Sequence, residues 1–288
     1  MKLARFTEQG RTRIGKIEGD RIVDLSAITG DNHSMRRLLN HYRDWLPALQ
    51  AATGPMFALS GVTLEAPIAD PQKFLGIGMN YRQHAEEARQ AGIPIPESQL
   101  WFNKQVSCIT GPFAGVVKPA VSDKVDYEIE LGVVIGQRCR HVKAADAADV
   151  IAGYLIVNDV SARDWLQKSP TFTLGKSFDT HGPIGPWLTT ADEIADPQDL
   201  QMSLYVNGER RQHWRTSDMI HTLYQQIEYL STVMTLEPGD ILATGTPSGI
   251  GAPTGRFLQV GDVMRLEIDG LGFIENPVIA DCAQEVMP

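Results

Sequence analysis

The sequence predicts an α+β fold dominated by antiparallel or mixed β-sheet. Strand-like segments outnumber helical ones and follow no regular βαβ rhythm. Turn dipeptides typical of hairpins separate several of them, namely Gly19-Asp20, Asn207-Gly208 and Asp269-Gly270. With 288 residues, of which 43% are hydrophobic, the chain can bury a sizeable core without disulfides or structural metals.

The first part of the chain is expected to be a small domain, 1–68, ahead of a larger domain, 69–288. Strands are predicted at 3–6, 12–18 and 21–25, and apolar residues at three- and four-residue spacing predict a helix from about Ser34 to Ala51. The turn-rich stretch from Gly54-Pro55 to Asp70-Pro71 is expected to be a connector.

The larger part alternates strands with few helices. The predicted strands are 73–77, 127–135, 154–160, 202–206, 209–213, 240–243, 263–269 and 273–278. Helices are predicted from an Asn80 cap to about Gln90, over 144–150, and from a Ser217-Asp218 cap to about Met234. Pro94 and Pro96 impose a loop after the first of these helices.

The composition is that of an ordinary soluble globular protein. Lys and Arg number 26 against 35 Asp and Glu, a net charge of −9 that argues against a general nucleic-acid binder. The cysteines, Cys108, Cys139 and Cys282, are far apart and fit free thiols in a reducing compartment. No apolar run follows Met1 and no stretch is long enough to span a membrane, so we expect a cytoplasmic protein without membrane contact.

Three acidic residues suggest a metal site. Period-two alternation puts Glu128 and Glu130 on one strand face, roughly 7 Å apart, where they repel each other unless solvent or a cation intervenes. Asp159 ends an apolar strand, where a buried carboxylate is costly unless hydrogen-bonded or metal-bound. This all-oxygen set suits Mg²⁺ first, then Mn²⁺ or Ca²⁺. The alternative is a sheet with one wet face, and sequence distance leaves open whether the two strands meet.

A candidate general base lies on the helix that begins near Asn80. His84 and Glu87 are three residues apart on one face, and a carboxylate beside an imidazole orients it and raises its basicity. The alternative is an incidental ion pair on an exposed helix. The proline-marked loop that follows is consistent with a lid and equally with an ordinary exposed loop.

Other segments offer weaker signals. Lys104 and Lys176 lie in weakly charged surroundings and either hold an anionic substrate or extend to solvent. The loop 245–251 could present N–H groups to an anion, but it lacks the lysine and spacing of a P-loop. Gly76 and Gly78 lack the third glycine of a dinucleotide site, so neither loop predicts nucleotide binding.

Six motifs in order, between about Phe74 and Val278, resemble the fumarylacetoacetate hydrolase family. They are Gly-Met-Asn-Tyr-Arg-Gln-His at 78–84, Asp-Tyr-Glu-Ile-Glu-Leu-Gly-Val-Val-Ile-Gly at 126–136, Asn-Asp-Val-Ser-Ala-Arg-Asp-Trp at 158–165, Thr-Leu-Gly-Lys-Ser-Phe-Asp-Thr at 173–180, Val-Asn-Gly-Glu at 206–209 and Gly-Asp-Ile-Leu-Ala-Thr-Gly-Thr-Pro at 239–247. The resemblance implies mixed β-sheet layers rolled around the site, a small N-terminal domain and a homodimer that acts on a small-molecule keto acid.

The resemblance also implies roles for individual residues. Glu128, Glu130 and Asp159 match the family's ligands for a divalent metal, usually Mg²⁺. His84 and Glu87 match a catalytic dyad on a lid helix, and Lys176 matches a lysine near the metal. Arg163 matches a residue that holds the acid substrate, and Thr246 matches a substrate-contacting threonine. Lys104 lies in a matching phenylalanine-x-lysine context. One departure matters for specificity, because Leu166 stands where many relatives have a glutamine, which here follows as Gln167.

The expected reaction is hydrolysis of a carbon–carbon bond in an acylpyruvate. The keto acid would chelate the metal, His84 would deprotonate a water that adds to the distal carbonyl, and pyruvate would leave as its enolate. Oxaloacetate decarboxylation, tautomerisation and hydroxymuconate-type isomerisation share that enolate and remain open as alternatives. A non-catalytic, metal-stabilised binding protein is a remote alternative.

Overall fold

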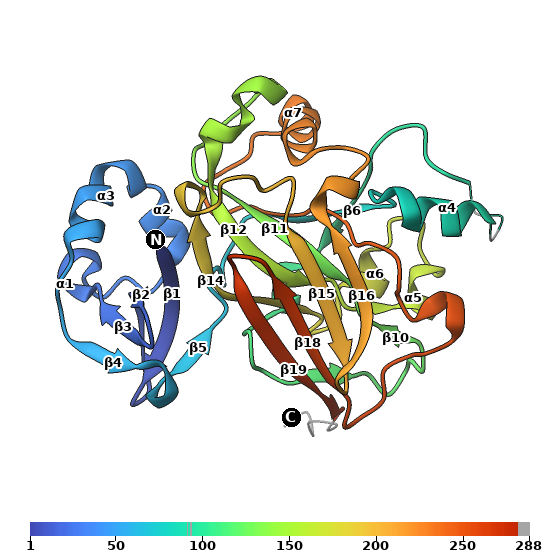
Figure 1. Cartoon of the computed structure of the whole chain (residues 1–288), viewed down its shortest axis with the longest axis horizontal. Coiled ribbons are helices and arrows are strands. Elements are labelled where there is room, and N and C mark those ends of the chain that lie inside the picture. Colours follow the sequence, from blue (N-terminus) through green and yellow to red (C-terminus); the bar gives the residue numbers. More distant parts are fainter. Residues whose placement is uncertain (91, 93, 282–288) are drawn as a thin grey trace, which may run out of the picture.

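A computed structural model describes residues 1–90, 92 and 94–281 (Figure 1). Within these residues the largest sheet has twelve strands: β1 (Lys2–Glu8), β2 (Arg11–Glu18), β3 (Arg21–Asp24), β4 (Met56–Ala58), β5 (Thr63–Glu65), β6 (Phe74–Gly78), β7 (Leu100–Lys104), β8 (Ile109–Thr110), β11 (Ile129–Ile135), β12 (Ile151–Asn158), β14 (Gly182–Thr190) and β17 (Ile241–Ala243). Its main path runs β4-β3-β2-β1-β14-β12-β11-β17-β6-β7, and most neighbours are antiparallel, although β17 and β6 are parallel.

A second sheet packs against the first in the larger part of the molecule (Figure 1). In the described chain it has five strands in the order β16-β15-β18-β19-β9, with bounds β9 (Val116–Lys118), β15 (Gln201–Val206), β16 (Glu209–Arg215), β18 (Val263–Ile268) and β19 (Gly272–Ala280). A short ribbon pairs β10 (Val125–Asp126) with β13 (Ser161–Ala162). Mixed sheets in two layers confirm the predicted α+β class.

The helices lie around the sheets. The α-helices are α1 (Ser26–Thr29), α2 (Met35–Leu39), α3 (Tyr42–Ala51), α4 (Arg82–Gln90), α5 (Arg163–Leu166), α6 (Thr173–Lys176) and α7 (Leu223–Val233). The 3₁₀ helices of the described residues are Leu59–Gly61, Val106–Cys108, Ala144–Val150, Ala191–Glu193, Thr216–Asp218 and Ala252–Thr254. Of these helices, α4 projects from the side of the molecule beyond β6 (Figure 1).

The N-terminal segment is joined to the rest through its first strand. β1 pairs with β14, Lys2 opposite Thr189, so the N-terminal strands extend the central sheet at one end (Figure 1). The predicted domain boundary between residues 68 and 69 stays a prediction. Among the residues that the structure describes, no helix is both long and apolar enough to cross a membrane.

Strands β11 and β12 lie at the centre and are buried on both faces. Tyr154 and Ile156 belong to the core beneath the second sheet, whereas Leu155 and Val157 belong to the core shared with the N-terminal helices. Every residue of β11 is buried. The alternative of a wet sheet face at Glu128 and Glu130 is therefore wrong, because packing covers both sides of this strand.

Several predicted elements differ from the structure. The helix predicted over 34–51 is two helices, α2 and α3, because the Asn40 side chain bonds back to the Arg36 carbonyl at 3.1 Å and ends the first one. The predicted connector 54–71 contains β4 and β5. The helix predicted to start at Ser217-Asp218 begins later, at Leu223, because a capping box formed by Thr222 and Gln225 starts it. Thr216–Asp218 form a separate 3₁₀ turn before it.

Two further expectations concern single residues. Asn80 does not cap α4, because its amide nitrogen donates to the carbonyls of His221 and Thr244 and its oxygen accepts from the His221 N–H. Cys108 and Cys139 are free and buried, as expected, whereas Cys282 lies outside the described residues.

Gly153 allows β12 to pack closely against β14. A Cβ at Gly153 would lie 2.1 Å from the Thr189 carbonyl oxygen, so the strand pair would have to separate. We expect Gly153→Ala to lower the free energy of unfolding by about 1–3 kcal/mol, as overpacking of cores generally does. Urea unfolding measures this effect. Gly61→Ala, where a Cβ would meet nothing within 4 Å, is the control, and equal stability of the two variants would contradict the expectation.

Candidate active site

Three buried carboxylates gather where β11 begins and β12 ends. Ile129 pairs with Asn158, and the Asp159 N–H donates to the Glu128 carbonyl at 2.9 Å, so the ladder continues past the strands. Because residues alternate across a strand, this register places Glu128, Glu130 and Asp159 on one face. Their ligand oxygens all lie within 4.8 Å of one another, and all three residues are buried.

Two cations pair with Glu128. The Lys176 Nζ lies 2.8 Å from Glu128 Oε2 and 2.5 Å from Asp159 Oδ2, and an Arg163 guanidinium nitrogen lies 2.6 Å from Glu128 Oε1. Burial acts to raise the pKa of Glu128, but attraction to Lys176 and Arg163 outweighs it and lowers that pKa to about 2. Glu128 is therefore ionised at neutral pH.

Glu130 has a different environment. Its Oε2 accepts a hydrogen bond from the Gly245 N–H at 2.8 Å, and no described cationic side chain forms an ion pair with it. Burial, with repulsion from Asp159 and Glu128, raises its pKa well above the ordinary value. A cation between the three carboxylates would remove that repulsion.

The charges of the described site residues fit a divalent cation. Four buried carboxylates, the triad and Asp126, face three cations, Lys104, Arg163 and Lys176, which leaves a formal excess of one negative charge. An all-oxygen donor set with one under-compensated carboxylate is what Mg²⁺ or Mn²⁺ requires. With a dication added the site would carry one net positive charge, which suits an anionic ligand.

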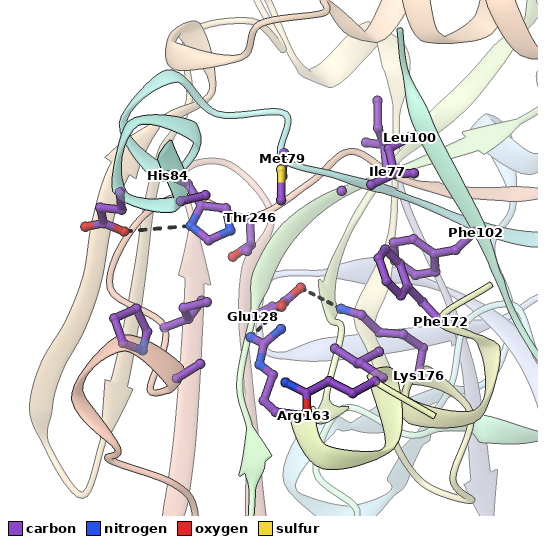
Figure 2. A pocket seen from close by; sticks show the side chains of 18 residues that line it. Ile77, Met79, His84, Leu100, Phe102, Glu128, Arg163, Phe172, Lys176 and Thr246 are labelled. Carbon is purple, nitrogen blue, oxygen red and sulfur yellow. Dashed lines mark hydrogen bonds and ion pairs between the residues drawn. The ribbon is translucent and has the colours of Figure 1, made fainter. Parts of the chain in front are cut away.

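A cavity of about 630 Å³ opens above Glu128 (Figure 2). Its polar lining comes from α4, the residue before β11, α5 and the residue after it, α6 and the loop after β17. The lining residues are His84, Glu87, Glu128, Arg163, Gln167, Lys176 and Thr246. Glu130 and Asp159 lie deeper and do not line it. Figure 2 shows His84 and Lys176 on opposite sides of the cavity, with Glu128 between them and Arg163 below Glu128.

His84 and Glu87 face the cavity from α4. His84 Nδ1 and Glu87 Oε2 are 3.7 Å apart, an ion-pair distance, and neither atom has a hydrogen-bond partner within the described chain. Interaction with the His84 imidazole lowers the pKa of Glu87, which keeps the carboxylate ionised. The pair is therefore arranged to orient the imidazole toward the cavity, as a general base requires.

The remaining predicted site residues divide into two groups. Thr246 lines the cavity, where its hydroxyl donates to the Ile129 carbonyl and accepts from Gln212. Lys104 does not line it. Its Nζ is fully buried behind the triad and donates to Asp159 Oδ1 at 2.6 Å and to the Lys176 carbonyl. This position fits support of Asp159 rather than the substrate contact predicted for Lys104.

Asp126 is a site residue that sequence reasoning missed. It accepts from Arg163 Nε at 2.8 Å and from the backbone N–H groups of Gly251 and Ala252. It thereby aligns Arg163 with Glu128 and ties the cavity loop to the sheet. The available signal was its place at the head of the Asp-Tyr-Glu-Ile-Glu motif.

His181 is a buried histidine behind the site. One ring nitrogen, Nε2, lies 3.0 Å from the Val117 carbonyl, and burial lowers the pKa of the imidazole to about 4. Because this folded pKa lies below the unfolded value of about 6.5, the neutral ring stabilises the fold fully above pH 6.5 and less as the pH falls toward 4.

We therefore expect His181 to make unfolding steeply pH-dependent. Between pH 7 and pH 5 the wild type should lose about 2 kcal/mol more stability than His181→Gln, in which an amide replaces Nε2 as donor to Val117. Urea unfolding at the two pH values gives this difference. Parallel losses in both proteins would contradict the assignment.

Two known protein families match most of the chain. Residues 73–279 match the family described as fumarylacetoacetate (FAA) hydrolase C-terminal, and residues 1–67 match the one described as Rv2993c-like, N-terminal. The first match covers more than half of the chain and includes every residue of the site described above.

Similar individual proteins include hydrolases and an isomerase. A Burkholderia ambifaria protein named as a candidate hydrolase is 45% identical over 282 residues, covering 94% of this chain and 96% of its own length. The structure of maleylpyruvate hydrolase from Sphingobium sp. SYK-6, in complex with manganese(II) ion and pyruvate, is 35% identical with a TM-score of 0.85, over 98% of this chain and 100% of that one. The 5-carboxymethyl-2-hydroxymuconate delta-isomerase of Mycobacterium smegmatis is 33% identical, with a TM-score of 0.79 and the same coverage.

Proposed function

This chain belongs to the fumarylacetoacetate hydrolase family, and on that premise we propose that it is a metal-dependent hydrolase of diketo acids. The bond cleaved is the carbon–carbon bond between the acyl carbonyl carbon and the methylene group of an acylpyruvate. One observation carries the proposal. A buried carboxylate triad with an excess of negative charge lies beneath a cavity whose opposite wall presents His84 and Glu87.

Glu128, Glu130 and Asp159 would hold the divalent cation, Mg²⁺ first, with Mn²⁺ or Ca²⁺ as alternatives. When bound, the cation supplies positive charge that polarises the keto acid and stabilises the developing enolate. The donor chemistry and charge of the site support this choice. The presence of manganese(II) ion and pyruvate in the complex of the similar maleylpyruvate hydrolase supports it too.

Arg163 and Lys176 line the cavity beside Glu128 and would bind the substrate carboxylate. Lys176 has three N–H donors and uses two on Glu128 and Asp159, so one remains for substrate. Carboxylates hold both cations in place, so the positive charges do not have to move when the transition state forms.

His84, oriented by Glu87, would remove a proton from water as the water oxygen adds to the acyl carbonyl. Collapse of that adduct breaks the carbon–carbon bond, releasing the acyl group as a carboxylic acid. The electron pair of the broken bond forms the pyruvate enolate. The protonated His84 can return its proton to the enolate carbon, which yields pyruvate and restores the base.

An isomerase is the second candidate, because one similar structure is a hydroxymuconate delta-isomerase. It would use the same enolate with His84 moving a proton between carbons and no water added. Oxaloacetate decarboxylation or tautomerisation would use the enolate as well. Hydrolysis is favoured here because His84 and its partner Glu87 face a cavity of about 630 Å³, which has room for a water beside the keto acid.

We extend the proposal to the setting of the enzyme. A homodimer that acts on a small-molecule keto acid, in the cytoplasm and without nucleic-acid or membrane partners, is what the family resemblance, the acidic charge and the free cysteines support.

Assays of acetylpyruvate and oxaloacetate side by side, with Mg²⁺ and an EDTA control, test the proposal. Pyruvate formed from acetylpyruvate only in the presence of metal is expected. Pyruvate from oxaloacetate alone would favour a decarboxylase instead. Loss of the enol chromophore without pyruvate would favour a tautomerase or an isomerase.

A further inference from the structure

We propose that the substrate carries an uncharged, apolar acyl group larger than acetyl, rather than a second carboxylate. This inference rests on the proposed function, since it describes the distal end of the same diketo acid. It follows from the composition of one side of the cavity, called the aromatic flank and formed by Ile77, Leu100, Phe102, Leu166 and Phe172.

The aromatic flank is built from several elements. Ile77 lies on β6 and Leu100 and Phe102 on β7, while Leu166 ends α5 and Phe172 precedes α6. The rings of Phe102 and Phe172 meet edge to face, with centroids 6.2 Å apart. Figure 2 shows Ile77, Leu100 and both rings together on one side of the cavity, away from His84.

Phe172 is held in a conformation that bulky residues rarely adopt. Its φ is 61°, in the left-handed region, and its carbonyl accepts the Lys176 N–H at 3.2 Å. Strain of this kind persists where surrounding structure holds it, and it gathers at ligand sites. Here it turns the Phe172 ring onto Phe102, which completes an apolar wall next to the reacting centre.

The cation nearest to this flank in the described chain is Lys176, whose Nζ lies 5.0 Å from the centre of the Phe102 ring, and its charge is already shared by Glu128 and Asp159. Among the described residues that line the cavity, the positively charged ones are Arg163 and Lys176. Arg163 pairs with Asp126 and Glu128, and Lys176 with Glu128 and Asp159. Both lie at the triad, where the pyruvate end of the substrate would bind.

A second carboxylate on the aromatic flank would lose its hydration without gaining a partner, which is strongly unfavourable. An alkyl or aryl group there gains contact with five apolar side chains. A cavity of about 630 Å³ also exceeds what an acetyl group fills. The physical preference is therefore for a medium-length or aromatic acyl group.

Two acylpyruvates that differ only at the chain end test this inference. In hexanoylpyruvate the chain ends in a methyl group, and in adipoylpyruvate a carboxylate replaces that methyl. With the Mg²⁺-loaded wild type, kcat/KM for the hexanoyl compound should exceed that for the adipoyl compound by about 100-fold or more. It should exceed that for acetylpyruvate by about 10-fold or more.

A substitution on the aromatic flank tests the inference independently. Leu166→Arg places a cation on the aromatic flank and should reduce the hexanoyl-to-adipoyl preference by about 10-fold or more. Leu174→Arg is the matched control, because Leu174 lies on α6 near the flank but is 52% exposed and does not line the cavity. It should leave the preference unchanged.

Equal or better use of the adipoyl compound by the wild type would overturn the inference while leaving the proposed hydrolase intact. If neither compound yields pyruvate, the proposed function fails, and calorimetric binding of both compounds to Mn²⁺-loaded protein then decides the inference. Binding of hexanoylpyruvate tighter by about 10-fold or more upholds it, and equal or weaker binding overturns it.

Discussion

Glu130→Gln is expected to abolish turnover by removing the divalent cation while leaving the apo protein folded and more stable. The substitution removes one of three ligand charges. Loss of an outer-shell partner alone typically lowers metal affinity by about 10–100-fold, so loss of a ligand charge should lower it further. Calorimetric titration with Mn²⁺, with pyruvate release measured in parallel, gives both effects.

The stability that Glu130→Gln gains without metal should depend on pH in a definite direction. Burial and repulsion from Asp159 and Glu128 raise the folded pKa of Glu130, so its carboxylate destabilises the fold increasingly as the pH rises above the unfolded value of about 4.3. Glutamine carries no charge and can still accept from the Gly245 N–H. The advantage of Glu130→Gln should therefore grow from pH 4 to pH 8.

Glu228→Gln is the control, because Glu228 lies on α7, away from the cavity, where its ion pair with Lys143 is partly exposed. It should leave metal affinity and turnover unchanged. Wild-type metal affinity in Glu130→Gln would contradict the metal site. Glu128→Ala or Asp159→Ala should abolish turnover too, but each leaves buried cations unpaired, so their lost stability obscures the cause.

His84→Ala is expected to lower kcat for hydrolysis by about 10²–10⁴-fold, the usual contribution of a general base. The affinity for Mn²⁺ should not change, because His84 is not one of the three carboxylate residues that would hold the cation and lies apart from Glu128 (Figure 2). Steady-state kinetics and metal titration on the same preparation separate the two effects.

Gln83→Ala is the matched control on the same helix, since Gln83 is exposed and does not line the cavity. The kcat of Glu87→Gln should fall between those of His84→Ala and Gln83→Ala, because the imidazole remains but loses the carboxylate that orients it. If His84→Ala lost metal as well as turnover, α4 would have a structural role and the base assignment would be wrong.

Local periodicity predicted much of the site. The alternation over 127–135 placed Glu128 and Glu130 on one face, and the end of an apolar run marked Asp159. Whether those strands meet depends on a long-range register, Ile129 opposite Asn158, that no local pattern contains. Burial on both faces likewise arises from two separate cores, so sequence could not distinguish a wet face from a metal site.

The errors have the same origin. Lys104 lies in a motif that suggested substrate contact, but pairing of β7 with β6 carries its side chain behind Asp159. Asn80 has the residue type of a helix cap, yet segments far along the chain, at His221 and Thr244, take its hydrogen bonds. In both cases, contacts with residues distant in the sequence determined where the side chain lies.

The most direct test of the proposed reaction is proton NMR of acetylpyruvate incubated with the Mg²⁺-loaded enzyme. Metal-dependent hydrolysis should yield acetate and pyruvate in equal amounts, with product formation stopped by a chelator and restored by added Mg²⁺. Consumption of acetylpyruvate without acetate, or equal product yields in the presence of excess chelator, would contradict metal-dependent hydrolysis of the carbon–carbon bond.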